Sequence, residues 1–345
     1  MIESFNRKEN RPPNIRSKNH GWKSAVAKFQ KPSIKRAIGQ LIDTVGAYAA
    51  TWLAIYLTIG ISFWLTFGLA ILGGGLVVRA FIISHDCGHG SFFASKRANS
   101  IVGFITGVIS LTPYQHWRWE HARHHTTSGD LERRGMGDLW IMTVQEFLEA
   151  SRWTRFCYRL ARNPIILIAF GALFLVLINN RFTTSNAGRA ERLSIYGTNV
   201  CILLVAFAMS WLFGFQTYLW IHFVIIMASG TSGVWLFYVQ HQFEGVYWER
   251  GDDWDFVSAA LEGSSFYRLP RVLQWFSGNI GYHHIHHLSS RIPNYNLEAC
   301  HHSNPLFQQV KAMNFRDSIS CLSCHLWDED NKKLISFKQF SKRVA

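Results

Sequence analysis

The sequence is poor in charged residues, and acidic residues are the scarcer kind. Asp, Glu, Lys and Arg make up 17% of the chain, with 22 acidic against 35 basic residues. Soluble globular domains carry about 25% charged residues. The apolar residues gather in long blocks, which is typical of membrane-spanning proteins. This composition argues against an ordinary soluble domain and predicts an integral membrane protein.

The net charge of +13 suggests nucleic acid as one partner to consider. The basic residues, however, lie in the N-terminal arm and between the apolar blocks. That distribution is what the positive-inside rule predicts for the cytoplasmic parts of a membrane protein. The sequence also contains no recognisable nucleic-acid-binding module. We therefore expect no nucleic-acid partner.

The six cysteines lack the spacing of a disulfide-stabilised secreted domain. Cys321 to His325 match the CxxCH pattern of c-type haem attachment. Because this segment is expected in the cytoplasm, where c-type haem is not normally attached, we interpret the motif as a chance pair of reduced thiols. The N-terminus has no apolar stretch before about residue 38, so we expect no secretory signal peptide.

Four apolar blocks are long enough to cross a membrane, since a spanning helix needs about 20 residues. They form two hairpins, which pair 37–57 with 63–83 and 196–213 with 217–239. Asp43 and Arg79 each fall near the cytoplasmic end of a span. There they either form an ion pair or reach the membrane surface separately.

Two further apolar segments, 101–112 and 164–178, are interpreted as non-spanning because they are short. A fifth crossing would also place the histidine clusters described below on opposite faces of the membrane. We therefore predict an all-α integral membrane protein with four transmembrane helices and a cytoplasmic helical cap. Residues 1–36 are predicted to form a basic cytoplasmic arm, flexible or lying on the membrane surface. One domain is predicted over 37–340, followed by a tail at 341–345.

Three compact histidine clusters lie near the ends of the predicted spans. The first has the pattern HxxxH and begins at His85, and the other two have the pattern HxxHH and begin at His121 and His283. Helical residues spaced by three or four share a face, so each cluster can direct its imidazoles to one point. Another histidine lies just past the last span. The nine candidate metal ligands are His85, His89, His121, His124, His125, His241, His283, His286 and His287.

Nine imidazoles are too many for one metal, since structural zinc takes four ligands and catalytic zinc takes three. They suit two metals with four or five ligands each, and imidazole-rich sites with an open position fit redox-active iron. At a membrane surface, the natural substrate is the acyl chain of a lipid. Removing hydrogen from an unactivated methylene requires metal-activated oxygen, because no side-chain acid or base can do it.

The residues around the clusters resemble the membrane fatty acid desaturase family. The resemblance rests on HDCGHGSFF from His85, HWRWEHARHHTTSGDL from His116, VQHQFE from Val239 and GNIGYHHIHHLSSRIPNYNLEACH from Gly278. Together these stretches are similar to the delta-12 (omega-6) acyl-lipid branch over about residues 37–340. The resemblance implies a di-iron centre bound by the box histidines and by His241, and O2 as co-substrate. It further implies a membrane lipid acyl chain as substrate, a cis double bond as product, and ferredoxin or cytochrome b5 as electron donor.

The resemblance also implies a multi-pass protein of the bacterial inner membrane, with its active site on the cytoplasmic side. Structurally known relatives carry an asparagine, bound to the metal through water, one turn before the histidine that corresponds to His241. This chain has Phe237 at that position. The last coordination position therefore departs from the family pattern.

The remaining histidines are interpreted as supporting residues. His116 and His284 adjoin the candidate ligands, His222 lies inside a span, and His301 and His302 follow the third cluster. Metal-bound histidines usually donate their second N–H to a carboxylate or carbonyl. The acidic residues that could accept it are Asp86, Asp130, Asp138, Glu244 and Glu298.

Two other functions stay open at this point. A related di-iron membrane hydroxylase or ketolase, acting on a carotenoid or alkane, would carry the same histidine boxes. A metal or haem carrier without catalysis would place paired histidines inside the spans, whereas the clusters here lie at span ends.

Overall fold

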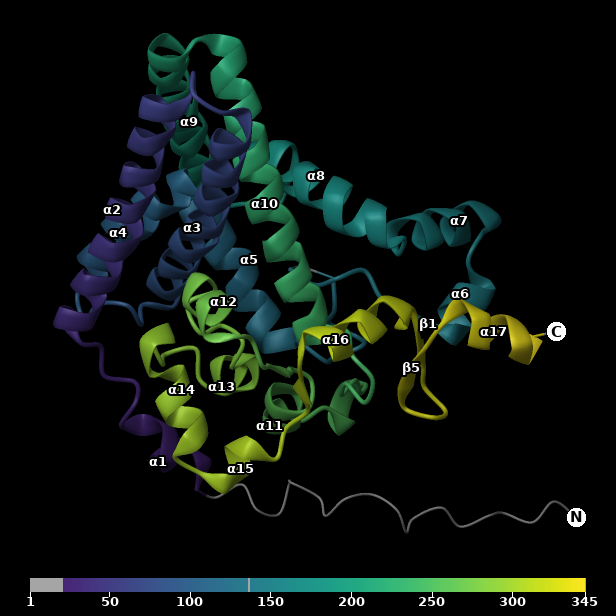
Figure 1. The fold of residues 1–345 in the computed structure, drawn as a ribbon. Coiled ribbons are helices and arrows are strands. Elements are labelled where there is room, and N and C mark those ends of the chain that lie inside the picture. The colour runs from purple at the N-terminus through teal and green to yellow at the C-terminus, as the bar shows by residue number, and fades with distance from the viewer. Residues whose placement is uncertain (1–20, 136, 345) are drawn as a thin grey trace, which may run out of the picture.

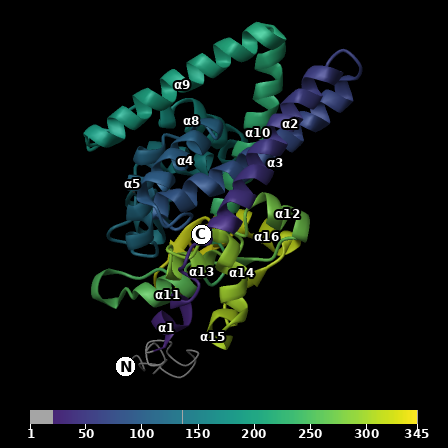
Figure 2. The same ribbon diagram turned by 90° about the vertical axis from the view of Figure 1, so that its left-hand side faces the viewer.

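Four long helices form the centre of the molecule, and shorter helices gather at one end of them (Figures 1 and 2). The computed structural model describes residues 21–135 and 137–344, so most of the predicted arm lies outside the described residues. The prediction of four helices able to span a membrane, arranged in two hairpins, is confirmed. The four are α2 (Ile34–Thr58), α3 (Phe63–His89), α9 (Arg189–Phe213) and α10 (Phe215–His241).

The helices extend beyond the apolar blocks that predicted them. Helix α3 continues to His89 and α10 to His241, so histidines occupy the last turn of both helices. Helix α9 begins at Arg189 rather than at 196. Hydropathy marks only the apolar part of a helix, whereas the ladder of backbone hydrogen bonds continues through polar turns. Helix α3 ends at Gly90, whose φ of 68° is the left-handed conformation that glycine favours.

Helix α3 is central and packs against α2, α4 (Lys96–Ile109) and α10. It approaches α10 closely at Gly74, where an added Cβ would lie 2.5 Å from the Cβ of Ala228. Around this crossing, apolar side chains of both helices, including Val77 and Ile225, form a buried cluster with Ile55 of α2. The small residue therefore brings two predicted spans into backbone contact.

Asp43 and Arg79 form the ion pair that was one of the two predicted arrangements. Arg79 Nη2 lies 3.5 Å from Asp43 Oδ1, and Arg79 Nε donates to Thr44 Oγ1 at 3.0 Å. The guanidinium carbon also lies 4.0 Å from the ring centroid of Trp275. A single cation thus joins α2, α3 and α12 (Arg271–Phe276).

The two apolar segments between the hairpins form shorter helices. The segment predicted at 101–112 contributes to α4 (Lys96–Ile109), which returns along α3 and is followed by α5 (Tyr114–Thr127). Residues 164–178 form a π-helical turn (Ile166–Phe170) and α8 (Gly171–Leu177). Together with α7 (Arg152–Ala161) they make a helix pair bent by 78°, which has the length and composition of a broken span or a re-entrant loop.

The other elements are short, and most of them cap the end of the spans where the histidines lie (Figure 1). Two small sheets interrupt the otherwise helical fold: β1 pairs with β4 and β4 with β5, while β2 pairs with β3. The helices are α1 (Trp22–Ala27), α6 (Val144–Glu149), α11 (Phe256–Leu261), α13 (His283–Leu288), α14 (Asn294–His302), α15 (Pro305–Gln308), α16 (Phe315–Ser318) and α17 (Phe337–Val344). The strands are β1 (Met142–Thr143), β2 (Phe266–Tyr267), β3 (Ala312–Met313), β4 (Leu326–Asp328) and β5 (Lys333–Ile335), and 3-10 turns cover Asn179–Arg181, Gly251–Asp253 and Ile319–Ser323.

The predicted ends of the domain differ from the described structure. Residues 21–33 were assigned to a flexible or surface-lying arm, but Val26 of α1 is buried in the core of the cap. The Ser33 amide donates to the Tyr295 hydroxyl, which ties this segment to α14. The predicted tail at 341–345 begins inside α17, whose Phe340 is buried.

Candidate metal centre

The structure brings all nine predicted histidines together at one end of the long helices. Helix α3 contributes two from its last turn, α5 contributes three from its second half, α10 contributes its last residue, and α13 contributes three. The i, i+3 and i+4 spacing works as predicted, because each helix presents its imidazoles on one face. The nine side chains divide into two groups.

The first group holds five histidines whose candidate ligand atoms all lie within 4.8 Å of one another. His121 Nε2 lies 3.1 Å from both His85 Nε2 and His125 Nε2. The indole of Trp117 stacks on the His121 ring with centroids 4.3 Å apart. The members of this group are His85, His89, His121, His125 and His286.

The second group is built around His241. Its Nε2 lies 3.2 Å from His124 Nε2, and the ligand atoms of these two and His287 lie within 4.8 Å of one another. His283 Nε2 completes the group, at 2.9 Å from His241 Nε2 and 3.1 Å from His287 Nε2. Four imidazoles from three helices thus face one point.

Two buried carboxylates determine which ring nitrogens carry protons. Asp86 Oδ1 accepts from His85 Nδ1 at 3.0 Å, and Asp138 Oδ1 accepts from His124 Nδ1 at 2.6 Å. A neutral imidazole has one N–H, so the Nε2 atoms of His85 and His124 present lone pairs to their groups. Neutral imidazoles oriented in this way by a carboxylate are the usual ligands of protein-bound metals.

Burial disfavours the charged form of five further imidazoles. It lowers the pKa of His121, His125 and His286 well below the usual range, and neighbouring imidazoles lower it further. The same two causes lower the pKa of His283 and His287 in the second group. Protonated rings would repel one another, so the donor set favours a metal cation over protons.

Several nitrogens have no hydrogen-bond partner among the described residues. The Nε2 atoms of His89 and His286 are buried in this state within the first group. Burying a polar atom without a hydrogen-bond partner costs free energy. These two nitrogens lie among the other candidate ligand atoms of the first group. The residues present therefore fit two metal ions, with five imidazoles for one and four for the other.

Of the five acidic residues predicted to support the ligands, Asp86 and Asp138 contact candidate ligands. Asp130 instead binds Arg133 Nε at 2.5 Å, and Glu244 and Glu298 are exposed. The sequence analysis missed Asn294, whose backbone N and Nδ2 donate to Asp86 Oδ2 at 2.6 and 2.8 Å. Asn294 is distant in sequence from Asp86, and no periodic pattern marks it.

The family model described as "Fatty acid desaturase" matches residues 62–313. The chain is also 46% identical over 313 residues to the "Fatty acid desaturase" of Bacillus subtilis (strain 168), covering 91% of this chain and 89% of that protein. This chain belongs to the fatty acid desaturase family. The resemblance predicted from the histidine boxes is thereby confirmed.

This desaturase-family chain also has more distant relatives, and their names specify different positions of the double bond. It is 28% identical over 330 residues to the "sn-1 oleoyl-lipid 12-desaturase" of Synechocystis, covering 88% of this chain and 86% of that protein. It is 29% identical over 279 residues to the "sn-1 acyl-lipid omega-3 desaturase (ferredoxin)" of the same organism, covering 77% and 74%. Acyl-lipid desaturases are therefore among its relatives, and similarity alone does not separate the two positions.

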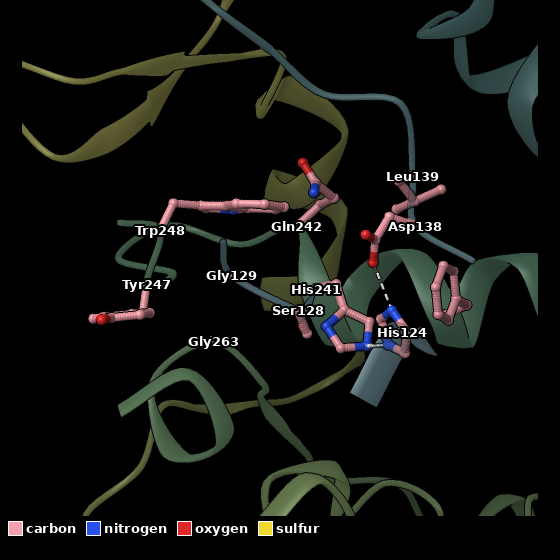
Figure 3. Close-up of a pocket in the computed structure, with 11 residues that line it drawn as sticks. His124, Ser128, Gly129, Asp138, Leu139, His241, Gln242, Tyr247, Trp248 and Gly263 are labelled. Carbon is pink, nitrogen blue, oxygen red and sulfur yellow. Dashed lines mark hydrogen bonds and ion pairs between the residues drawn. The ribbon is translucent and has the colours of Figure 1, made fainter. Parts of the chain in front are cut away.

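Phe237 places an apolar ring at the position where the resemblance led us to expect asparagine. Its centroid lies 5.3 Å from that of His124 and 5.1 Å from that of His241. Both histidines border a small cavity of about 10 Å³, which Gln242 also lines (Figure 3). Phe237 offers no ligand atom, so the second group has four imidazoles and no side-chain amide in this position.

The other histidines lie outside the two groups. His284 Nε2 and His301 Nδ1 are 3.0 Å apart, and His116 is buried beside Glu120 at 3.5 Å. His222 stacks on Tyr218 within α10, and His302 is exposed. None of these five joins either group of candidate ligands among the described residues.

The CxxCH segment lies in the buried core beside β4. Cys321 and Cys324 are free thiols, and burial raises their pKa to about 12 and about 11. The ring of His325 stacks on Phe337 with centroids 4.3 Å apart. All three side chains are thus engaged in packing, which suits the interpretation as a chance pair of thiols.

Proposed function

We propose that this chain is an oxygen-dependent acyl-lipid desaturase that introduces a cis double bond into a lipid acyl chain, in the delta-12 (omega-6) position. The observation that carries the proposal is the division of nine convergent imidazoles into groups of five and four at the end of apolar spans. The stretches around the histidine boxes, which resemble the delta-12 (omega-6) branch, support the position of the double bond, and a 12-desaturase is among the relatives.

In this proposal, iron is the metal in both groups. His85, His89, His121, His125 and His286 hold one ion, and His124, His241, His283 and His287 hold the other. When bound, iron supplies the one-electron chemistry with O2 that an unactivated methylene requires. Asp86 and Asp138 keep the Nδ1 protons of His85 and His124 in place, and this leaves their Nε2 lone pairs directed at the metals.

The surrounding protein shields much of the centre from water. His283, His286 and His287 are each at most 3% exposed, and Trp117 and Phe237 cover rings of the two groups. Exclusion of water protects a reactive centre from side reactions. The electrons come from an external donor such as ferredoxin or cytochrome b5, and one relative's name includes ferredoxin.

We further propose a multi-pass protein of the bacterial inner membrane with the metal centre on the cytoplasmic side. The positive-inside rule supports this side, because Lys35 and Arg36 begin α2 and Lys96 and Arg97 begin α4, near the histidine-bearing end. The substrate is then a membrane lipid whose acyl chain reaches the centre from the bilayer.

Expression in a host that makes only monounsaturated lipids tests the function directly. Mass spectrometry of the lipids should reveal a new double bond on the methyl side of the existing one. His286→Ala should abolish this product, whereas His302→Ala, an exposed histidine outside both groups, should leave it unchanged. A hydroxylated product would contradict the desaturase assignment and support a hydroxylase. A double bond only at the omega-3 position would contradict the delta-12 assignment alone.

A further inference from the structure

An apolar groove runs between α2 and α4, separate from the metal centre. Its volume is about 390 Å³, within the range of pockets that hold small ligands. Leu41 and Val45 of α2 face Val102 and Ile105 of α4 across it, and α4 lies beside the lower half of α2 (Figure 1). Because α2 is a candidate span, the groove opens where lipid would surround the protein.

Helix α3 separates this groove from the histidines. Ile83 and Cys87 of α3 are buried in a cluster with Leu41 and Val102 from the groove walls. His85 lies between them in sequence and projects from the opposite side of α3, since two residues turn a helix by about 200°. A chain lying in the groove would therefore not reach the two histidine groups. The groove is a candidate for a lipid other than the substrate.

Cations occupy the first turns of both helices that form the groove. Helices α2 and α4 begin close together, because Ala37 and Ala98 in their first turns pack on the same buried cluster. Lys35, Lys96 and Arg97 are exposed in these first turns. Within the described residues, none of the three forms an ion pair with an acidic side chain.

We propose that the groove binds an anionic phospholipid, with one acyl chain between α2 and α4 and the phosphate near Lys35, Lys96 and Arg97. The apolar walls match the chain, and the unpaired cations match a headgroup with net negative charge. Basic residues at a membrane surface each favour anionic lipid, and the amide ends of two helices add to this preference. The site does not depend on the proposed reaction.

Native mass spectrometry of the purified full-length protein tests the headgroup preference. The protein is released from micelles containing equal phosphatidylglycerol and phosphatidylcholine. We expect phosphatidylglycerol to be retained about tenfold over phosphatidylcholine, given three cations that are partly screened. The triple variant Lys35→Gln, Lys96→Gln, Arg97→Gln should lose this preference. The matched variant Lys333→Gln, Lys338→Gln, Lys342→Gln, with the same charge change on exposed residues elsewhere, should keep it.

A second pair of variants tests the groove itself. Gly46 lines the groove and Gly39 does not, and a Cβ at either position meets no atom within 4 Å. Gly46→Phe should therefore fill the groove and displace the retained lipid, whereas Gly39→Phe should not. Equal retention of both phospholipids by the wild-type protein, or unchanged retention in Gly46→Phe, would overturn the proposal. Failure of the desaturation assay would leave these binding results unaffected.

Discussion

At the scale of single residues, substitutions of His286 and His287 test most directly whether the two groups bind separate metal ions. They are neighbours on α13, yet His286 belongs to the first group and His287 to the second. We expect about two irons per chain in the wild-type protein, about one in either single alanine variant, and almost none in the double variant. Elemental analysis by mass spectrometry measures this directly. His284→Ala, on the same helix but outside both groups, should retain two irons. Loss of both irons from one single variant would show that the groups are not independent.

Asn294 is predicted to act on the first group through Asp86. Asn294→Ala removes the Nδ2 hydrogen bond to Asp86 Oδ2 and keeps only the backbone N–H donor, which loosens the carboxylate that orients His85. Second-layer changes of this kind typically lower metal affinity about 10–100-fold. The chelator concentration that removes half of the iron in the first group during dialysis should fall by about this factor. Asn296→Ala, whose hydrogen bonds go to Arg36 and Phe29 instead, is the control, and equal losses in both variants would refute the role.

The histidines were predictable because their spacing matches the helical repeat, and helices carried that spacing unchanged into three dimensions. Asn294 and Trp117 were not, because their roles depend on contacts between segments distant in sequence or on a stacking that any tryptophan could make. The sequence identified five acidic residues that could support the ligands, but it did not show which of them would contact a histidine. Asp86 and Asp138 became distinguishable from Asp130 once the packing showed which carboxylates lie beside the rings.

At the scale of secondary-structure elements, Arg79 holds the hairpin to the cap, and Asp43 is only one of its partners. Asp43 is about half exposed and 3.5 Å away, whereas Arg79 is buried and also contacts Thr44 and Trp275. We expect Asp43→Asn to cost about 1 kcal/mol or less. Arg79→Leu should cost about 2–4 kcal/mol, because it removes hydrogen bonds and a cation–π contact together. Thermal unfolding in micelles compares the two, and equal losses would contradict this ranking.

The long helices were predictable from hydropathy, but their ends and the small strands were not. Polar turns at Arg189 and His241 continue a helix without any apolar signal. Strands of two or three residues, such as β1 and β5, carry too few positions for an alternating pattern to be recognised. The bent pair of α7 and α8 is ambiguous for the same reason, because length and composition alone allow either a broken span or a re-entrant loop.

At the scale of the whole molecule, contacts between histidines decide how often the chain crosses the membrane. His124 Nε2 and His241 Nε2 lie 3.2 Å apart, so the chain between them must leave one face and return to it. Helices α9 and α10 supply two crossings. A third crossing by the bent pair would place the two histidines on opposite faces. We therefore infer four crossings, with the bent pair entering and leaving on the side of the metal centre.

Cysteine labelling of the full-length protein in intact cells tests this topology. Ser185 is exposed between the bent pair and α9, and Gly60 lies in the turn between α2 and α3. In a background where the partly exposed Cys157 and Cys201 are replaced by serine, an impermeant maleimide should label Gly60→Cys in intact cells. Ser185→Cys should react only after the cells are permeabilised, because four crossings place it on the same face as the histidines, which we propose is the cytoplasmic one. Labelling of Ser185→Cys in intact cells would mean that the bent pair crosses, and His124 and His241 could then not share a metal.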